Sequence, residues 1–248
     1  MIRYATIGRI AAGLALAGAG GAVLAQDLPV SGSLETSTRF FKGAESPVYF
    51  SGVYRAEISD FGLRVAFLTA PVTSSRIAGG TLRTGGKDFE LALERRFDLG
   101  LPLLSGGILI SAGAAFSEMQ NFRGTAVTYR AVASLPSGLG EVGVYGLTGE
   151  DLGIALLGAS GGFSQGGTSY KVFLGTPISG DNTRSTNTGR PTQRVVWAIT
   201  TGPAVGLDSR GVTFQAFVGN QLGLTTGAML TPALGDAVGF GFSFGVRF

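Results

Sequence analysis

Apolar and polar residues alternate with a period of two along most of the chain after residue 26. In the segment 30–40, for example, Val30, Leu34 and Phe40 fall on one face, and serine, glutamate and arginine residues fall on the other. Alternation of this kind is typical of a β-strand, whereas an amphipathic helix repeats every 3.6 residues. Gly, Pro, Asn, Asp and Ser interrupt the pattern at short intervals, as turns between strands do. The pattern therefore predicts an all-β chain of antiparallel strands.

Twelve segments carry the alternation: 30–40, 48–58, 61–67, 88–97, 107–117, 123–134, 141–148, 152–163, 169–176, 194–205, 212–221 and 238–248. Residues 77–84 are a candidate for a further strand, and counts of ten and fourteen stay open as alternatives. A count of twelve places the long or polar connections 41–47, 68–87, 177–193 and 222–237 at one end, and the tight turns 59–60 and 206–211 at the other. Transmembrane barrels have this asymmetry, with long outward loops and short inward turns.

The two ends of the chain carry distinct patterns. Residues 1–25 combine the basic Arg3 and Arg9 with an apolar stretch and end on small residues, which predicts a cleaved secretory signal peptide. Residues 26–248 are then expected to form a single barrel domain. The last strand places Val or Phe at every second position from Val238 to Phe248, with mostly glycine between them.

Composition narrows the class of protein. Mean hydropathy is +0.33, although no later segment has the roughly 20 consecutive apolar residues of a spanning helix. Apolar residues spread thinly over alternating strands indicate a transmembrane β-barrel. The chain has no cysteine, which excludes disulfides and a lipoprotein anchor. Of its 19 basic residues, two precede the predicted cleavage site, which leaves 17 against 16 acidic residues, so charge gives no support for a nucleic-acid partner.

Taken together, the export signal, the even number of alternating strands and the aromatic last strand resemble those of a bacterial outer-membrane β-barrel protein. The resemblance implies a transmembrane antiparallel up-and-down β-barrel in the bacterial outer membrane, surrounded by lipid. It also implies that Phe244, Val246 and Phe248 form the signal that the barrel-assembly machinery reads during biogenesis.

Motifs that suggest catalysis lack the required context. Residues 158–162 and 241–245 match the GxSxG pattern, and residues 138–143 match GxGxxG, but each lies beside or within strands rather than at a strand-to-helix turn. The chain contains no histidine to activate a serine, and histidine and cysteine are also the usual transition-metal ligands. Residues 180–182 lack the spaced acidic ligands of a calcium loop. We therefore expect no catalytic residues, no metal site and no cofactor.

Assigning the apolar face of each strand to lipid places the other face in the lumen. Four acids and eight bases are then predicted to line the pore: Glu35, Arg39, Arg55, Glu57, Arg64, Glu90, Glu94, Arg96, Arg130, Lys171, Arg194 and Arg247. Glu90 and Glu94 share a face among basic neighbours, which favours structural ion pairs. Arg95 falls on the lipid face near a strand end, where it can extend to the interface.

Several functional hypotheses follow. Eight strands enclose an interior just filled by side chains and sixteen leave an open channel, so twelve lie between. One hypothesis is a narrow porin-like channel with a weak preference for small anionic solutes, since excess arginine attracts anions. Alternatively, the same charges pair across the lumen and plug it. Another is a non-conducting structural or interaction barrel that serves secretion, polysaccharide export or surface attachment through its outward loops. A soluble secreted β-sandwich is the remaining alternative.

Overall fold

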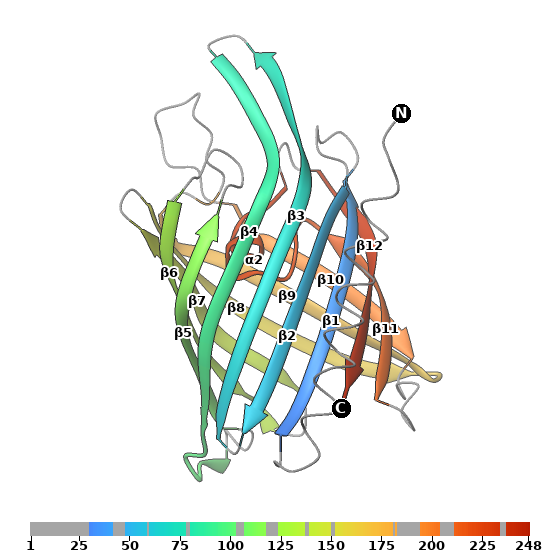
Figure 1. Ribbon diagram of the computed structural model, residues 1–248. Helices are drawn as coiled ribbons and strands as arrows, with labels where there is room; N and C mark the ends of the chain where they lie inside the picture. Colours follow the sequence, from blue (N-terminus) through green and yellow to red (C-terminus); the bar gives the residue numbers. More distant parts are fainter. Residues whose placement is uncertain are drawn as a thin grey trace.

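Twelve antiparallel strands close into one barrel in the computed structural model (Figure 1). It describes residues 30–41, 48–58, 60–77, 80–102, 107–117, 124–136, 139–149, 152–180, 182, 194–203, 211–233 and 237–248. The strands are β1 Val30–Phe41, β2 Val48–Ile58, β3 Phe61–Ile77, β4 Gly80–Phe97, β5 Ile108–Ser117, β6 Gly124–Ser134, β7 Gly140–Gly149, β8 Leu152–Gln165, β9 Thr168–Ser179, β10 Val196–Pro203, β11 Val212–Gly219 and β12 Gly239–Arg247. A five-residue helix, α2 Thr226–Leu230, lies between β11 and β12. The predicted signal peptide falls outside the described residues.

Each strand pairs with its neighbours in the chain, and β12 pairs with β1 to close the barrel. At the seam, the backbone amides of Gly32 and Phe248 each donate to the other's carbonyl oxygen, at 2.8 and 3.0 Å. Closure gives the backbone N–H and C=O groups of β1 and β12 partners along their outer edges. A barrel in lipid requires this, because no water is present there to bond to a free strand edge. The prediction of a twelve-stranded up-and-down barrel is confirmed, and the ten- and fourteen-strand alternatives are wrong.

The hairpin of β3 and β4 is longer than the sequence pattern predicts. Residues 68–87 were expected to form an outward loop, but pairing continues to Ile77 and Gly80, with one register shift between Ala70 and Thr73. The hairpin extends beyond the other strands at one end of the barrel (Figure 1). The candidate extra strand at 77–84 therefore belongs to this hairpin.

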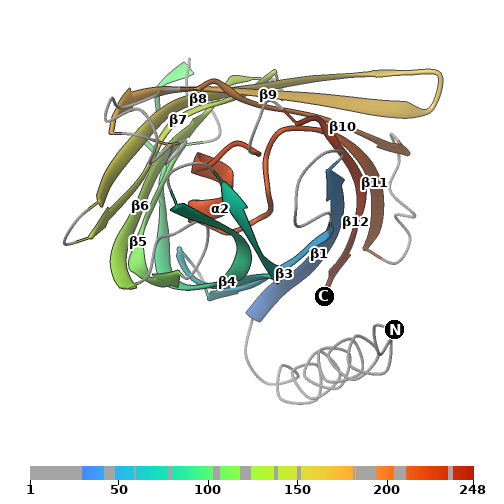
Figure 2. The ribbon, with the colours of Figure 1, turned by 90° about the horizontal axis from the view of Figure 1, so that it is seen from above.

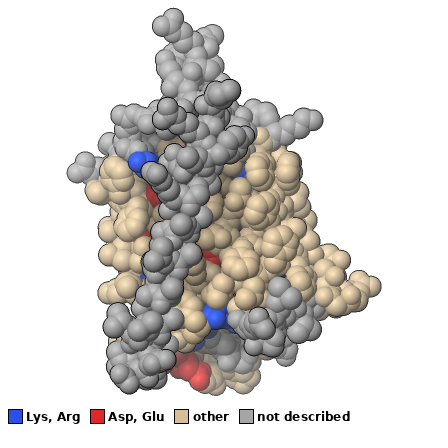
Figure 3. Space-filling model, turned by 45° about the vertical axis from the view of Figure 1, so that its right-hand side comes forward, with Lys and Arg blue, Asp and Glu red and all other residues tan. Residues whose placement is uncertain are grey.

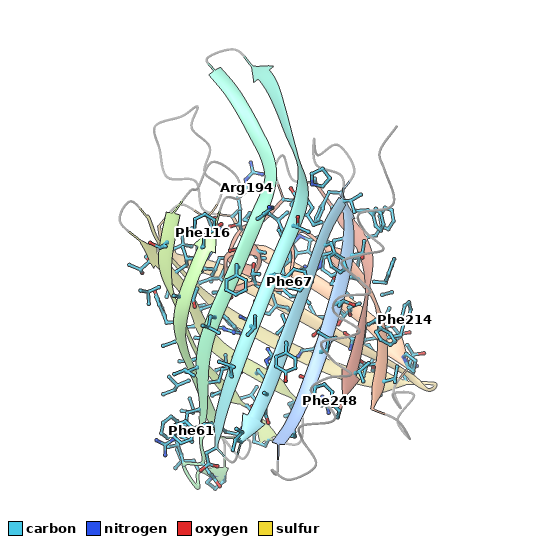
Figure 4. The ribbon with its side chains drawn as sticks, viewed as in Figure 1. Phe61, Phe67, Phe116, Arg194, Phe214 and Phe248 are labelled. Carbon is cyan, nitrogen blue, oxygen red and sulfur yellow. The ribbon has the colours of Figure 1, made fainter. Side chains whose placement is uncertain are left out.

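The outer face of the barrel is apolar, and the inner face is polar. Along β4, Asp88, Glu90 and Glu94 are at most 5% exposed, whereas Phe89 and Leu91 are nearly half exposed. The strands visible in Figure 3 have an outer surface that is largely free of charged residues. In Figure 4, Phe116 lies toward one rim, and Phe61 and Phe248 lie toward the other, as in the aromatic girdles of membrane barrels. In the part of the chain that is described, no helix is long and apolar enough to cross a membrane.

A soluble protein buries its apolar side chains and exposes its polar ones, whereas this barrel does the reverse. The alternative of a soluble β-sandwich is therefore excluded. Lipid is the environment that covers a continuous apolar outer band on a closed barrel. The chain is therefore an outer-membrane β-barrel, and its location is the bacterial outer membrane.

Residues Gln221–Ala233, here called the inward segment, turn into the barrel (Figure 2). The connection 222–237 was predicted to lie outward, and the described part of it instead lies within the ring of strands. Leu222 packs into a cluster on β1–β3 that includes Phe41, whereas Leu230 packs into a cluster on β6–β8 and β10 that includes Tyr145. The inward segment therefore bridges two apolar patches on different parts of the wall.

The glycines on the inner face of β12 make room for their neighbours. The ring of Phe41 lies where a side chain on Gly239 would be, and a side chain on Gly241 would meet the backbone of β1. Close approach of this kind is a usual role of glycine within strands. The glycine row seen in the sequence thus brings β1 and its buried residues close to β12.

Candidate functional site: a lumen crossed by the inward segment

The inward segment is a closed loop with internal hydrogen bonds. Its two ends meet through an isolated bridge between Gln221 and Pro232, and the Ala233 amide donates to the Asn220 carbonyl at 2.7 Å. Thr225 is the N-cap of α2 and accepts a hydrogen bond from the Ala228 amide, as hydroxyl residues at this position commonly do. Hydrogen bonds within the segment therefore define its shape independently of its contacts with the wall.

Asn220 attaches this loop to β10. Its side-chain oxygen accepts from the Trp197 amide at 2.7 Å, and its side-chain nitrogen donates to the Val195 carbonyl at 2.9 Å. Its own backbone amide donates to the Trp197 carbonyl at 3.0 Å. These bonds hold the base of the loop at the rim where β10 begins.

The tip of the inward segment contacts two acids on β4. The Thr225 hydroxyl donates to the Asp88 carboxylate. The Thr226 amide and hydroxyl both donate to Glu90, at 2.7 and 2.8 Å. All four side chains are buried. Hydrogen bonds to ionised acceptors are stronger than those between neutral groups, so these contacts define the position of α2.

Two arginines of the wall, on β3 and β1, bind the backbone of the segment. Arg64 donates to the Leu224 carbonyl at 2.6 Å, and Arg39 donates to the Gln221 carbonyl at 2.9 Å. The Arg39 guanidinium also lies over the Phe217 ring, 3.9 Å from its centroid. The planar fork of arginine lets one side chain combine a hydrogen bond with ring stacking.

Asn182 supports the far end of the inward segment. Its side-chain nitrogen donates to the Leu230 carbonyl at 3.1 Å and to the Arg194 carbonyl at 2.8 Å. Its side-chain oxygen accepts from the Arg194 amide at 2.9 Å. Asn182, in the loop 180–182, thus makes structural hydrogen bonds. Asp181 of the same loop lies outside the described residues.

Charged side chains pair along the wall. Glu90 lies 2.5 Å from Arg64 and 3.6 Å from Arg130, and Glu94 lies 3.2 Å from Arg130 and 3.5 Å from Arg55. These residues come from β2, β3, β4 and β6 on one side of the barrel. We refer to these five residues as the wall network. The expectation of structural ion pairs at Glu90 and Glu94 is confirmed.

Short side chains on β5 allow the wall network to form. Ser111 pairs in register with both Glu94 on β4 and Arg130 on β6, and Ala115 lies beside Glu90. Since both are small and face the lumen, Arg130 can reach over β5 to the acids of β4. The alternative in which charges pair across the lumen is therefore wrong for this network, and the lumen is crossed by the inward segment instead.

The other predicted lining residues lie apart from the wall network. Glu35, Glu57, Arg96, Lys171 and Arg247 share the inner face by register and lie toward the end that carries the C-terminus. Lys171 is 3.9 Å from Glu141, and both are substantially exposed. Arg194 lies at the opposite rim (Figure 4).

Several residues of the site were not predicted from the sequence: Asp88, Glu141, Asn182, Gln221, Thr225 and Thr226. Asp88 and Glu141 continue the inner-face alternation of β4 and β7, so the pattern contained a signal for both. The three residues of the inward segment had no such signal because they lie outside the strands.

Neither a scan of protein-family models nor a search of curated proteins finds a match. Among solved structures, the chain is similar to OccK3 (OpdO) of Pseudomonas aeruginosa, with a TM-score of 0.31, 10% identity, and coverage of 89% of this chain and 95% of that chain. It is also similar to OpdQ of the same organism, with a TM-score of 0.26, 11% identity, and coverage of 89% and 98%. The assignment to the outer membrane follows from the closed barrel and its apolar outer face.

Proposed function

We propose that this barrel is a narrow channel for small solutes, constricted by the inward segment, with a weak preference for anions. The observation that carries the proposal is the charged inner wall of a barrel with more strands than side chains alone can fill. A wall that had only to support a packed core would be stabilised as well by apolar residues. Fixed charges along a confined path are instead typical of a route for ions and polar solutes.

The preference for anions is expected to be weak. Asp88 and Glu141 join the four predicted acids on the inner face of the described residues, so six acids face the eight predicted bases. Glu90 and Glu94 are already paired within the wall network. Toward the C-terminal end, Arg96, Lys171 and Arg247 are exposed on the inner face. Glu35, Glu57 and Glu141 lie at the same end, so it is the excess of eight bases over six acids along the whole inner face that supplies the weak positive potential that would attract small anions.

The proposal includes the biogenesis of the barrel. Residues 1–25 would direct export and be removed, and the barrel-assembly machinery would read Phe244, Val246 and Phe248. These three side chains lie on one face of the last strand, and the Phe248 ring stacks on Tyr54 with centroids 6.3 Å apart. Besides lipid and this machinery, the proposed partners are small anionic solutes, without nucleic acid, cofactor or catalysis.

Single-channel recording in planar bilayers tests the channel and its selectivity. In a salt gradient, Lys171→Glu with Arg247→Glu should move the reversal potential toward cation selectivity, because both side chains are exposed on the inner face. Glu57→Gln is the matched control and should move it toward anions. An unchanged reversal potential in both variants would refute the proposed selectivity. Absence of current steps from folded protein at high load would refute the channel.

The second candidate is a non-conducting barrel that acts through its outward end. The inward segment favours it, because this segment crosses the lumen between two apolar clusters. The β3–β4 hairpin, which extends beyond the other strands, would then be the surface that contacts a partner in secretion, polysaccharide export or surface attachment (Figure 1). The same recordings separate the two candidates, since this one predicts no current steps.

A further inference from the structure

The inward segment is connected to the barrel differently from a strand. All twelve strand pairings are made without it, and its two ends meet each other at Asn220. Asn220 is fixed to β10, whereas α2 contacts β4, β7 and β8. The segment is therefore a flap whose base is fixed at Asn220 and whose body reaches across the lumen, where Asn182 and the two apolar clusters also contact it.

We propose that the inward segment is a movable gate, and that Asp88 and Glu90 are its latch, which hold the closed position through the hydroxyls of Thr225 and Thr226. This inference rests on the proposed channel function. In the closed position, the two hydroxyls and the Thr226 amide donate to the two carboxylates. When the segment swings away about Asn220, water replaces these donors, and the lumen opens beside β4.

The wall network keeps its charges paired when the gate opens. Glu90 remains 2.5 Å from Arg64, and Arg130 remains next to Glu94, because these contacts are all made between residues of the wall. An isolated buried charge would otherwise oppose the movement. Arg64, Arg39 and Asn182 lose only backbone carbonyl partners, which water can replace. Release also exposes the buried side chains of Leu222 and Leu230, which makes the closed position the favoured one. The chemistry of the latch therefore permits release without unfolding of the barrel.

A disulfide that locks the gate tests the proposal. A Cβ atom on Gly223 would lie 3.2 Å from the Cβ of Ser51 on β2, slightly inside the usual range of about 3.5–4.5 Å for a disulfide. Since the chain has no cysteine, Ser51→Cys with Gly223→Cys introduces the only thiols. Leu68→Ala accompanies them, because the Leu68 side chain contacts the new Cβ position. The two single-cysteine variants in the same background are the controls.

The oxidised variant should show at least tenfold less open time than its reduced form, and the single-cysteine controls should not respond to the reductant. Thr225→Val with Thr226→Val should act in the opposite direction and raise the ratio of open to closed time about tenfold or more, because the latch loses its hydroxyl donors. Thr200→Val, on the inner face of β10, is the matched control and should leave this ratio unchanged. Folding of each barrel is checked by heat-dependent gel mobility.

The outcomes separate the gate from the channel. If the oxidised, reduced and valine variants all conduct as the wild type does, the gate is refuted and the channel stands. A variant in which a short glycine-serine linker replaces residues 222–231 covers the remaining case. If neither the wild type nor this folded linker variant shows current steps, the channel itself is refuted. If it conducts while the wild type stays closed, and the valine variant opens, the gate is supported.

Discussion

Removing the charge of Glu90 should destabilise the barrel more than any other single replacement in the wall network. Its carboxylate is 1% exposed and accepts from the Thr226 amide and hydroxyl. It also lies 2.5 Å from Arg64 and 3.6 Å from Arg130. Glu90→Gln keeps the size of the side chain while it removes the negative charge that these two arginines share.

The magnitude follows from what each arginine retains. Arg130 still has Glu94 at 3.2 Å, whereas Arg64 is itself 1% exposed and keeps the Leu224 carbonyl, a neutral partner. One buried charge is therefore left without a counter-charge. Breaking a buried pair in this way costs about 3–5 kcal/mol, and we expect the free energy of unfolding to fall by that amount.

Urea unfolding in lipid vesicles measures this difference, with the fluorescence of Trp197, the single tryptophan, as the probe. Glu57→Gln is the control, since Glu57 is exposed on the same inner face, and it should change the free energy of unfolding by less than about 0.5 kcal/mol. Arg64→Met with Glu90→Leu removes both charges and should recover most of the loss. A loss of less than about 1 kcal/mol in Glu90→Gln would refute the view that Glu90 neutralises Arg64.

Two further predictions concern β12. Gly239→Ala should lower the free energy of unfolding by about 1–3 kcal/mol, because the Phe41 ring occupies the new methyl position; Gly153→Ala, where a Cβ meets no atom within 4 Å, should change it far less, and equal effects would contradict this packing argument. Phe248→Ala should reduce the fraction of protein assembled in the outer membrane of cells more than the fraction that refolds in vesicles. Phe214→Ala, which alters another outward aromatic residue, is the control, and parallel losses in both assays would contradict a role of Phe248 as an assembly signal.

The strand faces were predictable because the signal for them is local. Each strand between water and lipid repeats every two residues, so Phe89 and Glu90 identify their faces without knowledge of the partner strands. The count of twelve followed from the lengths of the connections. By contrast, the extension of β3 and β4 over residues 68–87 was missed. The alternation identifies only strands that separate lipid from the lumen, and the sequence 68–87 is rich in Thr, Ser and Gly, as connections are.

The inward segment was not predictable from the same pattern. Its contacts join residues far apart in the sequence, such as Thr226 with Glu90 and Gln221 with Arg39. Residues 221–233 have neither a period of two nor the length of an ordinary helix, so their sequence predicts only a connection. The clearest retrospective signal is Asp88 on the inner face of β4, since a buried carboxylate needs a hydrogen-bond donor and Thr225 of the inward segment supplies it.

Because the wall network and the latch share Glu90 but differ in their other residues, variants can separate the free energy of unfolding from the open time of the gate. Glu90→Gln and the paired valine variant of Thr225 and Thr226 both weaken contacts between β4 and α2. Only the first leaves Arg64 without its counter-charge, because Arg64 pairs with Glu90 within the wall. The valine variant should therefore change open time with little change in the free energy of unfolding of the strands, whereas Glu90→Gln should change both. If the valine variant instead unfolded at the same urea concentration as Glu90→Gln, the inward segment would be part of the structural core of the barrel, and its assignment as a gate would fail.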